Sequence, residues 1–170
     1  MILVYAFSNQ WGTNVSRLTA VALAKEVRVD VNKNIDIKII NGHPKPFFEK
    51  HIKNNHYDLI IGLGDGSKFI NKIKIETQAK NNYLNKTIIP YSPISLELSL
   101  PIIDLYDPSC FFISDNMGNY NCNYLAYLIQ HEINNKSPTT QQLFFHLPLR
   151  QNAINIAKNI SEILINNNLL

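Results

Sequence analysis

Apolar and polar positions alternate along the chain with two different periods, and these periods predict the fold. Short apolar runs or strict alternation indicate strands, whereas apolar side chains three and four residues apart indicate helices. Strand patterns cover residues 2–6, 35–40, 59–64, 73–79, 95–98, 110–114 and 142–147. Helical patterns follow a cap at Thr13 or Asn14, open with Pro44 and Pro46, cover 119–134, and run from 153 to 164. Strands that alternate with helices predict an α/β protein, a single-domain α/β/α sandwich with a mostly parallel, mixed central sheet.

The segment from Asn81 to Pro108 is the least regular part of the pattern because it contains four prolines. Proline cannot donate a backbone hydrogen bond, so it interrupts both helices and strands. We expect loops there, around the short strand at 95–98 and a brief helix near Ile102.

Length and composition narrow the class of protein. A chain of 170 residues can build one domain with a full core, so we expect a single domain over residues 1–170. Hydrophobic residues make up 45% and charged residues 17%, which is typical of a globular protein. The net charge is +3 and the lysines are dispersed, so nucleic acid is not an expected partner.

The sequence shows no clear targeting signal, membrane-spanning segment or metal-binding motif. The apolar N-terminal stretch lacks a charged leader, and no apolar run approaches the ~18 residues of a spanning helix. We therefore expect a cytoplasmic protein that does not contact membranes. Cys110 and Cys122 then read as free thiols, and four histidines lack the spacing of metal ligands, so no metal is expected.

Three residues on separate segments carry the candidate chemistry. Cys122 falls in the first turn of a predicted helix, after Gly118 and a possible cap at Asn119, where free N–H groups favour a thiolate and could hold an oxyanion. His146 lies at the carboxyl end of a strand and can act as a base. Glu76 can orient the imidazole, which completes an arrangement suited to nucleophilic acyl transfer.

Each of these residues also has an ordinary structural interpretation. A cysteine in a helix is often a small core side chain, a histidine at a strand end is often structural, and a glutamate is often solvated.

The turn at 62–66 resembles a dinucleotide loop, but the spacing of its glycines is wrong and a strand follows it.

Taken together, these segments resemble the pyroglutamyl-peptidase I family, also called pyrrolidone-carboxylate peptidases. The similar motifs are the run Met117-Gly118-Asn119-Tyr120-Asn121-Cys122-Asn123, the turn His146-Leu147-Pro148, and Glu76 followed by Ala79 and Asn81. The resemblance spans about residues 2–150. It implies an α/β/α sandwich without metal or cofactor that removes an N-terminal 5-oxoproline. Peptides with a blocked N-terminus would be its partners, and the protein would be a homo-oligomer, a dimer or tetramer.

The resemblance also assigns substrate-binding residues, with departures from the family pattern. Phe7 matches an aromatic of the first loop, and Trp11 fits the second aromatic only with a shift of one residue. Asp65, before Gly66, stands where the family has a pocket glutamine. Tyr120 is a further pocket candidate.

The family's Asp-Ala-Arg stretch has no counterpart here, although Lys86 falls near its position. Two alternatives therefore stay open. One is a related cysteine peptidase or amidase with altered N-terminal specificity, and the other is a non-catalytic binding protein on the same scaffold.

Overall fold

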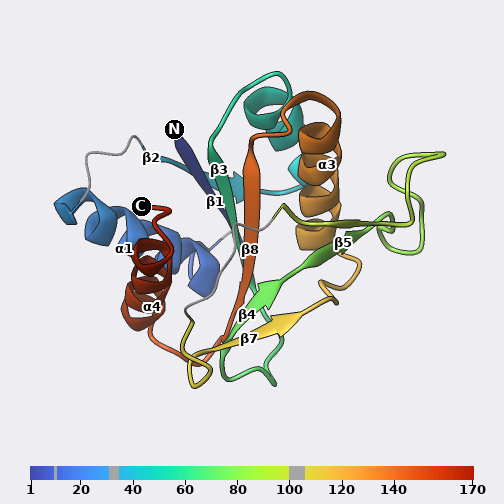
Figure 1. Cartoon of the computed structure of the whole chain (residues 1–170). Coiled ribbons are helices and arrows are strands. Elements are labelled where there is room, and N and C mark those ends of the chain that lie inside the picture. Colours follow the sequence, from blue (N-terminus) through green and yellow to red (C-terminus); the bar gives the residue numbers. More distant parts are fainter. Residues whose placement is uncertain (10, 31–34, 100–105) are drawn as a thin grey trace.

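A six-stranded mixed sheet forms the centre of the protein (Figure 1). The computed structural model describes residues 1–9, 11–30, 35–99 and 106–170. The strand order is β2-β1-β3-β8-β4-β7. These strands are β1 (Ile2–Ser8), β2 (Ile35–Asn41), β3 (Leu59–Asp65), β4 (Ile73–Glu76), β7 (Phe111–Ser114) and β8 (Gln141–Leu147). Among the described strands of this sheet, β4 and β8 alone pair in an antiparallel sense, which confirms the predicted mostly parallel, mixed sheet.

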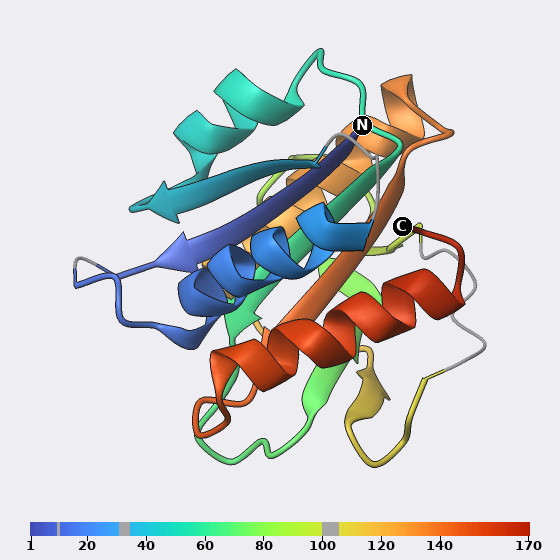
Figure 2. The same cartoon turned by 90° about the vertical axis from the view of Figure 1, so that its left-hand side faces the viewer.

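Helices cover both faces of the sheet. Helices α1 (Val15–Asp30) and α4 (Ala153–Asn166) lie side by side across one face (Figure 2). The other face carries α2 (Pro44–Phe47), the π-helical turn η1 (Phe48–Ile52) and α3 (Asn121–Lys136). Within the described residues, no helix is long and apolar enough to cross a membrane.

The two-residue period of β1 shows why there are two cores. Ile2, Val4 and Ala6 pack beneath α1 and α4, whereas Leu3 and Tyr5 point to the face covered by α3. Successive side chains of a strand point to opposite faces, so an unbroken apolar run is buried on both sides.

The strand predicted over 73–79 is wrong as a single element. It splits at Thr77 into β4 and β5 (Gln78–Lys80), and β5 pairs with β6 (Ser95–Glu97) in a separate two-stranded sheet. The Thr77 N–H bonds the Ser114 carbonyl at 2.8 Å, while the Thr77 carbonyl accepts from Leu98. Thr77 thus bonds to the six-stranded sheet through its N–H and to the segment that follows β6 through its carbonyl. The brief helix expected near Ile102 lies outside the described residues.

The cap of α1 comes from elsewhere in the chain. Asn14 precedes the helix, but its side-chain amide donates to the Phe7 carbonyl and the Ser16 hydroxyl. The Ser16 N–H instead donates to Asp65 Oδ1 at 2.8 Å. The carboxylate at the end of β3 therefore satisfies a free donor of α1 and lies where the helix dipole favours negative charge.

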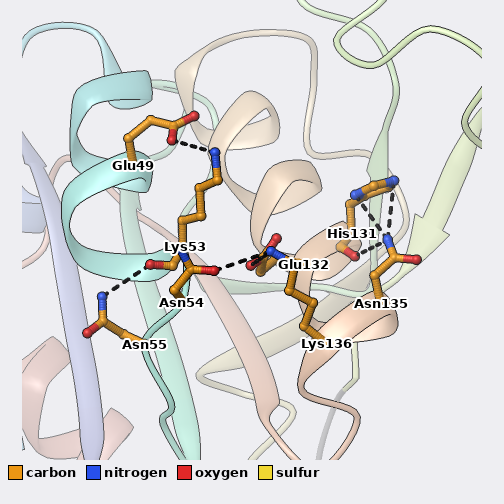
Figure 3. Close-up of polar contacts among 8 residues, drawn as sticks. All are labelled: Glu49, Lys53, Asn54, Asn55, His131, Glu132, Asn135 and Lys136. Atoms are coloured by element: carbon orange, nitrogen blue, oxygen red, sulfur yellow. Dashed lines mark hydrogen bonds and ion pairs between the residues drawn. The ribbon is translucent and has the colours of Figure 1, made fainter.

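A hydrogen bond connects the turn after η1 with the C-terminal half of α3 (Figure 3). Lys136 donates to Asn54 Oδ1 at 3.3 Å and also forms an ion pair with Glu132 of its own helix at 3.1 Å. Lys53 pairs locally with Glu49 at 2.9 Å. Exposed pairs of this kind contribute about 0–1 kcal/mol each, so they add little to the stability of the fold.

Candidate active site

A glycine on β3 marks the point where the candidate residues meet. Gly64 faces α3 and lies opposite His146 in the register of β3 and β8. A Cβ atom at Gly64 would lie 2.7 Å from Cys122 Sγ and 3.2 Å from His146 Cδ2. The sulfur and the imidazole carbon are therefore no farther apart than the sum of these two distances. Because Gly64 has no side chain, the Cys122 sulfur can pack directly against the sheet.

The start of α3 presents Cys122 in the first turn, as predicted. Gly118 adopts a φ of +84°, a conformation that glycine reaches without steric cost. The predicted cap at Asn119 is wrong, because Tyr120 precedes the helix and makes no side-chain capping bond. The Tyr124 N–H bonds the Tyr120 carbonyl at 2.9 Å, so the N–H groups of residues 121–123 precede the helical ladder. Such groups can donate to an oxyanion.

Asn123 is a site residue to which the sequence analysis gave no role. Its fully buried side chain donates to the carbonyls of Lys80 and Asn82 at 2.8 and 2.7 Å and accepts from the Lys80 N–H at 2.7 Å. These bonds fix the first turn of α3 to the chain that follows β5. The only signal in the sequence was the position of Asn123 directly after the cysteine.

His146 and Glu76 form a buried pair on the face covered by α3. His146 Nδ1 lies 2.6 Å from Glu76 Oε1, and Glu76 is fully buried. A carboxylate at Nδ1 favours the tautomer with its proton on that nitrogen. Nε2, which is bonded to Cδ2, is then the ring nitrogen left to accept a proton.

Lys74 is a second residue that the sequence analysis missed. Its ammonium lies 2.9 Å from the same Oε1 of Glu76 and donates to the Asn116 carbonyl at 2.6 Å. The Lys-Ile-Glu alternation on β4 places residues 74 and 76 on one face. That alternation was the available signal.

The surroundings of Cys122 favour the neutral thiol. Burial, and after it the negative charges of Asp65 and Glu76, raise its pKa from the ordinary 9.0 to about 12. This loss of solvation opposes the predicted effect of the helix terminus, which favours a thiolate. In the described residues, no group of three potential ligands is placed to hold a metal ion.

The predicted aromatic pocket residues do not form a pair. Phe7 is half-buried and contacts Tyr5 edge-on, with ring centroids 6.1 Å apart. Trp11 is 75% exposed and stacks on no ring of the described chain. Tyr120 is also exposed, with its ring 6.2 Å from that of Tyr83.

The turn after β3 positions the other two pocket candidates. Asp65 is engaged by the Ser16 N–H described above. The Gly66 N–H donates to the Leu147 carbonyl at 2.9 Å, and a Cβ there would collide with Ile70. Both residues therefore shape the backbone beside His146. Lys86, the counterpart considered for the family's arginine, is exposed at a hairpin turn where its N–H donates to the Tyr83 carbonyl.

The fold matches solved structures of one group of peptidases. Pyroglutamyl peptidase I of Bacillus amyloliquefaciens superposes with a TM-score of 0.75 and 18% identity, over 96% of this chain and 92% of that one. A mutant pyrrolidone carboxyl peptidase of Pyrococcus furiosus gives 0.78 and 18%, over 99% and 97%. The enzyme of Thermococcus litoralis gives 0.77 and 16%, over 99% and 92%. No protein-family model matches the sequence, and a search of curated proteins finds no match. The chain thus has the fold of the pyroglutamyl peptidases along nearly its whole length.

Proposed function

We propose that this protein is a cysteine peptidase that removes an N-terminal pyroglutamyl residue from peptides. The observation that carries the proposal is the convergence of three side chains at Gly64. Cys122 Sγ and His146 Cδ2 both lie next to the position of its missing Cβ, and Glu76 holds His146 Nδ1 at 2.6 Å. Solved structures with this fold are named as pyroglutamyl and pyrrolidone carboxyl peptidases, which supports the substrate.

The proposed reaction begins with proton transfer from the Cys122 thiol to His146 Nε2. The sulfur attacks the carbonyl carbon that joins the pyroglutamyl ring to the next residue, and N–H groups at the start of α3 stabilise the oxyanion. The C–N bond then breaks, and the imidazolium gives its proton to the leaving amine. Water, deprotonated by His146, hydrolyses the thioester, which releases pyroglutamate and restores the thiol. Glu76 stabilises the imidazolium in both halves of the cycle.

The test is hydrolysis of a 5-oxoprolyl-coumarin amide. The wild type is expected to release coumarin, and Cys122→Ala is expected to lose at least about 10³-fold in kcat/KM because the attacking sulfur is gone. Cys110→Ala is the matched control, since it removes the other thiol, which donates a hydrogen bond to Asp107 Oδ2. Activity that survives in Cys122→Ala would contradict the mechanism.

A second candidate is a related peptidase with altered N-terminal specificity. The observation that favours it is the pocket, where the rings of Phe7 and Trp11 do not pair and a carboxylate, Asp65, stands beside the thiol. A panel of peptides with different N-terminal residues decides between the two. A preference for 5-oxoproline over every other residue would exclude this candidate, whereas binding without turnover of any peptide would favour a non-catalytic protein.

The predicted cytoplasmic location and homo-oligomeric state belong to the same proposal. Fractionation of cells tests the location, and light scattering of the purified protein measures the oligomeric state.

A further inference from the structure

Four aromatic side chains pack together beside the start of α3, and the proposed reaction gives none of them a role. The centroid of the Tyr83 ring lies 4.9 Å from that of Tyr124 and 6.2 Å from that of Tyr120. The His43 ring lies 5.6 Å from Tyr83 and 5.1 Å from Tyr124. Rings at such separations attract each other beyond the burial of their area. The members of this aromatic cluster are His43, Tyr83, Tyr120 and Tyr124.

The aromatic cluster lies at the same edge of the sheet as the candidate active site. His43 follows β2 and precedes α2, whereas Gly64 and His146 are the last residues but one of β3 and β8. These three strands run parallel to one another through β1, so their carboxyl ends meet at one edge. Ligands of open α/β sheets bind beyond that edge. The helices α2 and α3 also cover the same face of the sheet, so the cluster and the site share one side of the molecule.

The cluster flanks the first turn of α3 on the side away from the sulfur. Cys122 faces the sheet, because its sulfur lies beside Gly64. Tyr124 comes two residues later, which places it about 200° around the helix axis. Tyr120 is 61% exposed and His43 is exposed as well, so the cluster presents ring surface to solvent.

Hydrogen bonds fix Tyr83 to the residues that precede the nucleophile. The Tyr83 hydroxyl donates to Asn121 Oδ1 at 3.0 Å, and Asn121 is the residue directly before Cys122. The backbone N–H of Leu84 donates to the Asn119 carbonyl at 2.9 Å. The ring of Tyr83 is therefore held in a constant position relative to the start of the helix.

A strained turn holds Tyr83 from the other side. Tyr83 and Lys86 exchange backbone hydrogen bonds of 2.8 and 2.9 Å, which close a two-residue turn. Leu84 and Asn85 in this turn have φ values of +50° and +65°, a left-handed conformation that costs a leucine energy. Such strain persists only where the surrounding contacts enforce it, and it is common at ligand sites.

We propose that the aromatic cluster binds the residue that follows the scissile bond and favours an aromatic side chain there. This inference rests on the proposed function, because it concerns the leaving half of the peptide. The pyroglutamyl ring is attached directly to the attacked carbonyl and must lie close to the sulfur. The sheet closes that side of the sulfur with Gly64 and Phe144, so the rest of the peptide leaves outward across the first turn of α3. Exposed rings that are already fixed lose little freedom on binding, which favours them as contact residues.

The experiment compares pyroglutamyl dipeptide amides that differ only in the second residue. The wild type is expected to cleave the phenylalanine peptide with a kcat/KM about tenfold above that of the alanine peptide, because the larger side chain buries a ring against the cluster. Release of the free amino-acid amide is followed by chromatography.

Variants of the cluster test which residues carry this preference. In Tyr120→Ala and Tyr83→Ala the ratio of the two kcat/KM values is expected to fall toward one. Tyr120 makes no side-chain capping bond, so its removal does not depend on refolding of the turn. Tyr83→Phe is expected to keep the ratio, because the ring remains. Tyr91→Ala is the matched control, since Tyr91 is a fully exposed tyrosine of the same loop outside the cluster.

Three results would overturn the inference. They are equal kcat/KM values for the two peptides in the wild type, a ratio that stays unchanged in both alanine variants, and a change only in the discrimination between pyroglutamyl and prolyl N-termini. Each is distinct from a failure of the proposed function, in which neither peptide is cleaved. In that case calorimetry decides: Cys122→Ala is expected to bind the phenylalanine peptide more tightly than the alanine peptide, and equal affinities would overturn the inference.

Discussion

Gly64 offers the sharpest test of the site, because a single methyl group there would occupy the place of the sulfur. In Gly64→Ala the new Cβ would lie 2.7 Å from Cys122 Sγ, 3.0 Å from Phe144 Cζ and 3.2 Å from His146 Cδ2. The backbone at Gly64 is in the ordinary range of φ, so alanine meets no conformational strain. Any effect must therefore come from these contacts.

The size of the effect follows from the overlap. Non-bonded heavy atoms prefer a separation of about 3.5–4.0 Å, so the sulfur must move by roughly 1 Å. Overpacking of a dense core costs about 1–3 kcal/mol of unfolding free energy. A displacement of ~1 Å between a nucleophile and its base can reduce the rate about 10²-fold. We expect losses of this order in stability and in kcat.

The assay combines urea unfolding with turnover of the coumarin amide. Gly62→Ala is the matched control, since the atoms nearest to its Cβ belong to Phe144 and Tyr5 on the same face, whereas the atom nearest to a Cβ at Gly64 is the sulfur. It should lose stability but retain more activity than Gly64→Ala. In a Cys122→Ala background the stability cost of Gly64→Ala should fall by about 1 kcal/mol, because the nearest atom is gone. A Gly64→Ala protein with wild-type stability and activity would refute the geometry.

Three further predictions concern the charges around the thiol. Because the pKa of the Cys122 thiol is raised to about 12, its alkylation by iodoacetamide should be slow at neutral pH without substrate and should rise with pH without a plateau. A plateau near neutrality would contradict this. Because the folded pKa exceeds the ordinary 9.0, the stabilisation from the neutral thiol is complete below pH 9 and is lost toward pH 12. Urea unfolding across this window should show a smaller loss of unfolding free energy in Cys122→Ser than in the wild type. Equal losses would argue against a raised thiol pKa. Glu76→Gln should reduce kcat at least about 10²-fold with little change in KM, measured by steady-state kinetics, because the amide cannot stabilise imidazolium; an unchanged kcat would remove Glu76 from the mechanism.

The sequence predicted the elements well where a local period decides the structure. The apolar run of β3 and the helical spacing of α3 were both found, and so was the glycine turn before Cys122. The split at Thr77 was missed because the residue exchanges one sheet partner for another, and apolar alternation continues through it. A periodic pattern describes burial, whereas the change of partner depends on strands distant in sequence.

The contacts around the candidate site could not be predicted from local sequence patterns, because they join residues far apart in the chain. Asp65 caps a helix that begins 50 residues earlier in the chain, a separation of 49 from Ser16. Asn123 bonds Lys80 across 43 residues, and Lys74 reaches the carbonyl of Asn116 across 42. The raised thiol pKa likewise depends on burial, which a cysteine in a first helical turn does not reveal. Family motifs located Cys122, but they carry no information on its solvation.

The placement of Asp65 connects the charge of the site with its specificity. The carboxylate is engaged by the start of α1, yet its field still raises the pKa of the Cys122 thiol. A pyroglutamyl ring offers this carboxylate only a lactam N–H, from which the amide oxygen of an asparagine can also accept. For such a substrate the negative charge of Asp65 opposes thiolate formation, and Asp65→Asn should speed both alkylation and turnover. A peptide with a free N-terminal ammonium would instead pair with the carboxylate, and Asp65→Asn should then raise KM. The effect of Asp65→Asn therefore separates the two specificities. Faster turnover of the pyroglutamyl substrate fits a carboxylate whose role is to cap α1. A higher KM for peptides with a free N-terminus fits a carboxylate that binds substrate.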